Sequence, residues 1–249
     1  MTAGTAQGRP VTRLAELRRL CPLAAGLAAV GVAVPPLYGL AHRYELVQAV
    51  QFSVFAMVVP ALVVTGAPRG SLWPRAHRFL EHAAAQRVAH PEPFRAVALL
   101  ALFMCAAIAW RTPGAVEAIG HNPWLLGVEA LSLVAIGVGF WSELLEAGPL
   151  VPRTGRPFRA VMAAVAMWTV WTISYLAGFS STSWYTGFDN VVGHGLSAAA
   201  DQQFATGVAW LIAAVVFMPV VFSSLITWLR SEDGLDGEVH RSAVRPGPG

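Results

Sequence analysis

The sequence contains no lysine and few charged side chains of any kind. All 17 basic residues among its 249 are arginine, and charged residues amount to 12% of the chain against 55% hydrophobic residues. Soluble domains carry about 25% charged residues, so this chain has too little charged surface to cover its apolar residues in water. Disorder is excluded as well, because a disordered chain has low hydrophobicity. We therefore expect an integral membrane protein.

Other absences exclude whole classes of function. The net charge is only +3, and the arginines lie between apolar runs rather than in one patch, so we expect no nucleic-acid partner. The two cysteines, Cys21 and Cys105, form neither a CxxC motif nor a zinc spacing. No GxSxG, HExxH or phosphate-binding glycine loop is present, so the chain is not expected to be an enzyme.

Long apolar runs dominate what remains. A helix needs about 20 apolar residues to cross a bilayer. Six runs are candidates for such spans, at roughly 22–41, 47–66, 96–110, 124–144, 160–179 and 203–229. We predict an all-α integral membrane protein whose residues 22–230 form six transmembrane helices in one bundle. A cleaved signal peptide is the alternative interpretation of the first run, because a basic arm precedes it.

The arginines predict the orientation of the six spans. Fifteen of the 17 lie in the N-terminal arm, the 67–95 and 145–159 loops and the C-terminal tail, which share one side of the membrane. Only Arg43 and Arg111 lie on the other side. Because cytoplasmic loops are enriched in Arg, we expect the arm (1–21) and the tail (231–249) in the cytoplasm. The lysine-free, alanine-rich composition is typical of GC-rich bacterial genomes, so we predict a multi-pass protein of the bacterial plasma membrane, in contact with lipid.

Two cytoplasmic features follow from this topology. Residues 71–87 place Leu72, Phe79 and Leu80 on one helical face, with arginines on the other, which predicts a helix lying in the membrane interface. Glu143 and Glu146 close the fourth span on the same side, and we expect both to be solvated.

Polar residues gather at the predicted outer ends of the spans, where ionisable groups are costly and often functional. The second span opens with Glu45, Gln48 and Gln51, Glu129 lies inside the fourth, and Asp189 and His194 precede the last. We predict a binding site at this outer mouth that contains Gln48, Gln51, Glu129, Asp201, Gln202 and Gln203. The candidates for metal ligands in it are His121, His194, Glu129 and Asp201.

Each of these residues also has a purely structural interpretation. Asp201 precedes a helix and is suited to cap it. Glu129 is suited to a buried hydrogen bond, and Gln48 and Gln51 to hydrogen bonds between helices. The two histidines are typical loop residues. The sequence does not decide between these interpretations and a binding site.

Three motifs resemble the CtaG-type cytochrome c oxidase assembly factors. Residues 200–230, "ADQQFATGVAWLIAAVVFMPVVFSSLITWLR", are similar to that family's closing span, with its Asp-Gln-Gln and final Trp-Leu-Arg. Residues 50–68 end in Gly-Ala-Pro like the family's second motif, and residues 128–141 contain the glutamate and the Phe-Trp of a third. The resemblance extends in order from about residue 30 to 235.

The resemblance implies a copper site whose ligands are replaced here. The family's second-span histidines correspond to Val47 and Gln51, and its His-x-x-Glu-His motif corresponds to Leu126, Glu129 and Ala130, so only the glutamate remains. Imidazole binds copper well, whereas amide and aliphatic side chains do not. Copper is therefore the cofactor that the resemblance implies, and the residues themselves identify none.

The function implied is assembly of a respiratory haem-copper oxidase near its copper centre, on the extracytoplasmic side, without copper binding by this chain. Its partner would be an oxidase subunit or a copper carrier protein. The alternatives are a structural accessory subunit of a membrane complex and a transporter of metals or small solutes. Transport is disfavoured because the span middles are apolar apart from prolines.

Overall fold

The computed structural model describes residues 9–66, 93–122, 124–146, 152, 154–188 and 195–243. Every regular element in these ranges is helical. The elements are α1 (Arg9–Ala33), α2 (Leu37–Ala41), α3 (Glu45–Ser53), the π-helix η1 (Val54–Val58), α4 (Val59–Gly66), α6 (Pro93–Trp110), α7 (Pro113–His121), α8 (Trp124–Leu144), α9 (Arg156–Gly178), the 3-10 helix η2 (Thr186–Phe188) and α10 (Ala198–Ala243). The all-α expectation is confirmed for the described residues.

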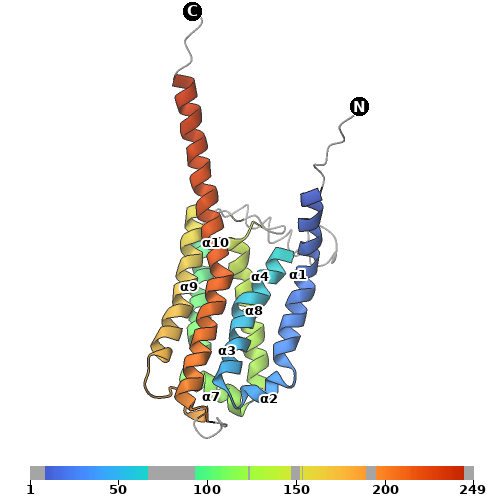
Figure 1. The fold of residues 1–249 in the computed structure, drawn as a ribbon, viewed down its shortest axis with the longest axis vertical. Helices are drawn as coiled ribbons and strands as arrows, with labels where there is room; N and C mark the ends of the chain where they lie inside the picture. Colours follow the sequence, from blue (N-terminus) through green and yellow to red (C-terminus); the bar gives the residue numbers. More distant parts are fainter. Residues whose placement is uncertain are drawn as a thin grey trace, which may run out of the picture.

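The long helices run side by side along one axis (Figure 1). The start of α1 and the C-terminal half of α10 lie at one end of the bundle, which we call the terminal end. The short helices α2 and α7 lie at the other end, which we call the closed end. α10 packs most extensively on α9 and next on α3. The last helix therefore lies against elements from the start and the end of the chain.

Five helical segments are long and apolar enough to cross a membrane. They are Glu45–Gly66, Pro93–Trp110, Trp124–Leu144, Arg156–Gly178 and Ala198–Glu232. These correspond to the last five of the six predicted spans. The first predicted span, 22–41, is not one helix: α1 ends at Ala33 and α2 starts at Leu37. Pro35 and Pro36 explain the break, because proline lacks the amide donor and clashes with the preceding helical turn. The apolar part of α1, Leu20–Ala33, is shorter than the other five.

Pro60 explains the π-helix in the middle of the second span. Its missing N–H leaves the α-helical ladder without a donor at that point, and the wider turn of η1 (Val54–Val58) accommodates the ring. Gly137 of α8 lies directly against it: a Cβ at Gly137 would be 2.5 Å from Pro60 Cγ. Only glycine allows the two helices to approach this closely.

Stacked aromatic rings fill the centre of the bundle. Phe103 stacks on Phe140 with centroids 4.8 Å apart, and Trp141 stacks on Phe217 with centroids 5.0 Å apart. All four side chains are at most 1% exposed. In contrast, large apolar side chains such as Leu131 (75% exposed) cover the outside of the bundle. Apolar side chains thus lie both in the centre and on the outside of the bundle, which fits a protein whose outer surface is covered by lipid.

The two cytoplasmic features expected from the topology are a helix over residues 71–87 and the solvated pair Glu143 and Glu146. The 71–87 segment lies outside the described residues. The expectation that Glu143 is solvated is wrong: the residue is 5% exposed, and its carboxylate lies 3.6 Å from Arg95 Nε. A carboxylate at the last turn of an apolar helix is shielded when an arginine from the neighbouring helix folds over it. Glu146, two residues beyond α8, is half exposed as expected.

Candidate functional site: a buried polar cluster at the closed end

The start of α3 is capped by a residue 156 positions further along the chain. The side chain of Tyr44, the residue before α3, makes no capping hydrogen bond. The amide of Glu45 donates to Asp201 Oδ2 at 2.5 Å instead. α10 has its own cap, because Ser197 Oγ accepts a hydrogen bond from the amide of Ala200. The interpretation of Asp201 as the cap of its own helix is therefore wrong. Its carboxylate faces the positive end of α3 instead.

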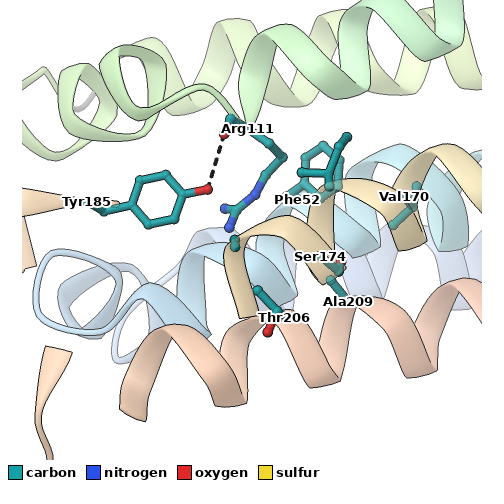
Figure 2. A pocket seen from close by; sticks show the side chains of 9 residues that line it. Phe52, Arg111, Val170, Ser174, Tyr185, Thr206 and Ala209 are labelled. Carbon is teal, nitrogen blue, oxygen red and sulfur yellow. Dashed lines mark hydrogen bonds between the residues drawn. The ribbon is translucent and has the colours of Figure 1, made fainter. Parts of the chain in front are cut away.

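The buried polar cluster consists of eight residues: Glu45, Gln48, Gln51, Arg111, Glu129, Tyr185, Asp201 and Gln202. Arg111 lies at its centre, beside Tyr185 (Figure 2). Its Nη2 donates to Glu45 Oε1 at 2.8 Å, and the two side chains are 7% and 2% exposed. The guanidinium also lies over the rings of Phe52 and Tyr185, at 5.7 and 5.2 Å from their centroids. The Tyr185 hydroxyl donates to the carbonyl of Arg111 at 3.1 Å. The α6–α7 connection is thus fixed to α3 and to the loop before α10.

The cluster contains more acidic than basic groups. Glu129 of α8 is 4% exposed, and its charge, like that of Glu45, acts to raise the pKa of the Arg111 guanidinium. Burial alone would lower the pKa of the Arg111 guanidinium, but Tyr185 and Glu45 raise it above its ordinary value, so the arginine stays charged. Asp201 Oδ1 is buried without a hydrogen-bond partner among the described residues.

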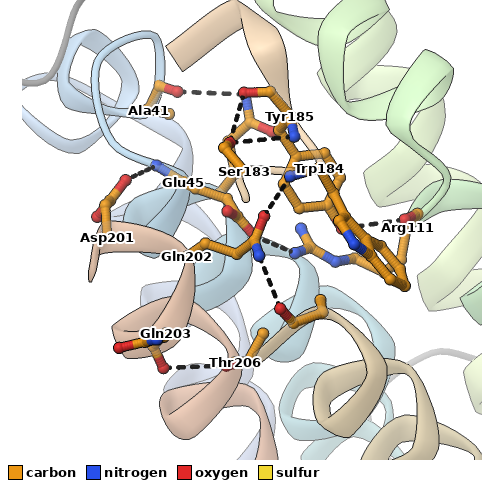
Figure 3. A network of polar contacts seen from close by, with 12 residues as sticks. Ala41, Glu45, Arg111, Ser183, Trp184, Tyr185, Asp201, Gln202, Gln203 and Thr206 are labelled. Carbon is orange, nitrogen blue, oxygen red and sulfur yellow. Dashed lines mark hydrogen bonds and ion pairs between the residues drawn. The ribbon is translucent and has the colours of Figure 1, made fainter. Parts of the chain in front are cut away.

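Amide side chains complete the cluster (Figure 3). Gln202 Nε2 donates to the carbonyl of Ala177 at 2.7 Å, and its Oε1 accepts from the amide of Trp184 at 2.7 Å. One fully buried side chain thus satisfies two backbone groups at the end of α9 and in the loop that follows. Gln48 and Gln51 hydrogen-bond the carbonyls of residues before α3, at Ala41 and Val32.

The structure brings together most of the predicted site residues. Gln48, Gln51, Glu129, Asp201 and Gln202 are all buried at the closed end. Gln203 is exposed and contributes only its backbone carbonyl, to Thr206. His121 is also exposed, with Nδ1 2.8 Å from the carbonyl of Glu117. His194 and Asp189 lie outside the described residues.

Three residues of the cluster were not selected from the sequence. Glu45 opens its span but is not part of the predicted site, Arg111 serves there only as a topological charge, and Tyr185 lies in a loop without a site motif. A signal for Arg111 does exist in the sequence. It is one of only two arginines on the arginine-poor side, and it directly follows an apolar run, where an unpaired charge is costly.

The donor set does not fit the copper site that the resemblance implies. Gln51 uses its amide nitrogen on a backbone carbonyl, and the other three corresponding positions are aliphatic. No group of three or more His, Cys, Asp and Glu side chains suited to a metal occurs in the described part of the chain. The cavity beside Arg111 and Tyr185 has room for roughly one water molecule. The described cluster thus consists of one ion pair, Arg111 with Glu45, and a set of hydrogen bonds.

A comparison with known protein families identifies the family of this chain. The family model of the cytochrome c oxidase caa3 assembly factor (Caa3_CtaG) matches residues 3–231. The chain belongs to this family. No curated protein and no solved structure matches it. The family match includes every residue of the buried cluster, and thus agrees with the resemblance seen in the sequence motifs.

Proposed function

We propose that this protein is a membrane-embedded, non-enzymatic assembly factor for a respiratory haem-copper oxidase of the bacterial plasma membrane, and that it acts without holding copper in a histidine site. The observation that carries the proposal is the family match over residues 3–231. The loss of imidazoles at Val47, Gln51, Leu126 and Ala130 supports the second part.

We further propose that the chain crosses the membrane six times, with both termini in the cytoplasm. This topology is supported by the arginine distribution and by the start of α1 and the C-terminal half of α10, which lie at the same end of the bundle, as expected for an even number of crossings (Figure 1). In this orientation, the buried polar cluster faces the extracytoplasmic side, where an oxidase subunit or a copper carrier protein would be held.

The cluster supports holding a partner better than it supports transport. A transport path needs polar groups and space near the middle of the membrane. Here the polar groups lie at one end, where most of them are ion-paired or hydrogen-bonded within the protein, and aromatic rings fill the centre. The ion pair and the hydrogen bonds of the cluster provide a fixed geometry for the helix ends and loops of the closed end.

The decisive experiment uses a strain that lacks the gene. We expect its membranes to contain terminal oxidase with its haem spectrum retained and its copper content reduced, and a plasmid copy of the gene to restore the copper. An unchanged oxidase would overturn the proposal and would favour a structural subunit of another complex, which co-purification would then identify.

Two variants locate the activity in the cluster. Asp201→Asn keeps an oxygen that is able to cap α3 but removes the buried charge, and we expect it to restore oxidase copper poorly. Gln203→Ala changes the exposed neighbour of the buried Gln202 and should restore it fully. Protein amounts in the membrane are measured for both. Equal restoration by the two variants would refute a role for the cluster.

A further inference from the structure

A second polar feature lies at the terminal end of the bundle. A cavity of about 200 Å³ opens between the last turn of α8, the first turn of α9 and the facing side of α10. Its charged lining consists of Glu146, Arg156 and Arg159, and α10 contributes the hydroxyl residues Ser223, Ser224 and Thr227. It lies at the opposite end of the molecule from the cluster of Arg111 (Figure 1).

Arg159 is the most informative residue of this cavity. It is 5% exposed, although it lies in the first turn of a membrane-spanning helix. Its Nη2 donates to Glu146 Oε1 at 2.5 Å and its Nη1 to the Leu144 carbonyl at 3.4 Å. The Nε–H is buried with no hydrogen-bond partner among the described residues. Burying an unpaired donor is costly, so this guanidinium has an unmet demand for an acceptor.

The charge of the cavity favours an anion. One carboxylate, Glu146, is shared by two arginines, since Arg156 Nε also lies 3.6 Å from its Oε1. The Arg156 side chain is 40% exposed, so much of it is accessible. Ser223 and Thr227 donate their hydroxyl protons to α10 carbonyls. The two guanidinium groups are therefore the charged donors available to a ligand, and Ser224 adds a hydroxyl to the lining.

The geometry of two arginines at a helix start selects the ligand class. Guanidinium forks bind tetrahedral phosphate oxygens through pairs of charge-assisted hydrogen bonds. The positive end of α9 acts in the same direction. The cavity also lies where the apolar spans of α8 and α9 end, which is the depth of lipid headgroups in a bilayer.

We propose that this cavity binds a phosphate group, through Arg159 and Arg156, in competition with Glu146. The phosphate has two sources, an anionic phospholipid headgroup or soluble inorganic phosphate, and both offer the same oxygens. This site is independent of the proposed role in oxidase assembly, because it shares no residue with the buried cluster.

The test is a titration of the purified, delipidated full chain in detergent, followed by native mass spectrometry. The probes are phosphatidylglycerol, phosphatidylcholine and inorganic phosphate. We expect phosphatidylglycerol or phosphate to bind, and Arg159→Gln to weaken that binding by about tenfold or more, as expected for the loss of a charge-assisted hydrogen bond. Arg95→Gln, which removes another arginine of the same end that does not line the cavity, should leave it unchanged.

A second variant separates binding from folding. Glu146→Gln removes the competing carboxylate while both arginines remain, so it should tighten binding, whereas a merely destabilised protein would bind more weakly. Binding of phosphatidylglycerol alone identifies a lipid site, and equal competition by inorganic phosphate identifies a soluble ligand. No binding of either, equal effects of Arg159→Gln and Arg95→Gln, or weaker binding by Glu146→Gln would each overturn the proposal.

Discussion

The two ends of the bundle use the same chemistry in opposite ways. At the closed end, the Arg111–Glu45 pair has side chains that are 7% and 2% exposed. At the terminal end, the Arg159–Glu146 pair joins an arginine that is 6% exposed to a glutamate that is 53% exposed. Both are arginine–carboxylate contacts near the end of an apolar span. They differ in whether the carboxylate can leave.

This difference separates a structural pair from an exchangeable one. When both charges are buried, losing either leaves the other without compensation, so the pair is fixed in place. When the acid is exposed, water replaces it at little cost and another anion can take its place. The closed end is therefore built to hold helices in position, and the terminal end retains an arginine that can change partners.

The largest effect expected from this comparison is the loss of Arg111. Arg111→Gln leaves Glu45 buried without its cation, and we expect it to cost about 3–5 kcal/mol of stability. Arg156→Gln, which removes a partly exposed arginine from the half-exposed Glu146 while Arg159 stays in place, should cost less than about 1 kcal/mol. Thermal unfolding in detergent compares the two. Similar losses would contradict the distinction between a fixed and an open end.

The next effect concerns the amide that joins α9 to the following loop. Gln202→Ala leaves the amide of Trp184 without its acceptor and removes one hydrogen bond from the carbonyl of Ala177, which keeps the bond from the amide of Ser180, and this should cost about 1–3 kcal/mol. Gln203→Ala, one residue further on and exposed, should change stability by no more than about 0.5 kcal/mol. The same unfolding measurement applies. Indistinguishable variants would show that the cluster does not stabilise the closed end.

A smaller effect distinguishes the two pairs by salt. The coupling of Glu146 with Arg159, measured by a double-mutant cycle with Gln at both positions, should be about 1 kcal/mol and should fall as salt rises, because the Debye length shrinks from about 10 Å at 0.1 M to about 3 Å at 1 M. The coupling of Glu45 with Arg111 should be larger and nearly independent of salt. A salt-independent Glu146 coupling would show that this pair is closed as well.

The smallest effect is the pH dependence of the open pair. The hydrogen bond from Arg159 holds the pKa of Glu146 below its ordinary value of 4.5. The pair therefore contributes its full stability above pH 4.5, and this contribution is lost as the pH falls through the lowered pKa. The difference in unfolding temperature between the wild type and Glu146→Gln should shrink in acid. A difference that persists at the lowest pH would argue against this assignment.

The sequence predicted the membrane spans well where composition alone decides them. The prediction of 124–144 coincides with α8, and 47–66 differs from the observed segment only at its start. That start depends on Asp201, which caps α3 from far away in the chain, and no local pattern shows such a contact. Pro35 and Pro36 predict an interruption of the first span, and the structure confirms it, because α1 ends at Ala33 and α2 begins at Leu37.

The candidate site was predicted as a set of acids and amides without their cation. Hydropathy assigns Arg111 to a loop, and its role appears only when α3 and the α6–α7 connection are brought together by the fold. Gln202 and Gln203 look alike in sequence, but one is fully buried and the other exposed, because successive helical residues point in directions about 100° apart. Individual pairings thus required the structure.

The continuous α10 has a mechanical consequence. Its 46 residues, at a rise of about 1.5 Å each, make a rod roughly 69 Å long, more than twice the thickness of a hydrocarbon core. The rod passes through Pro219 without a break and carries Asp201 in its first turn. A force applied along the axis of the C-terminal half would therefore be transmitted to Asp201. From there it would reach the first turn of α3 through the hydrogen bond with the amide of Glu45.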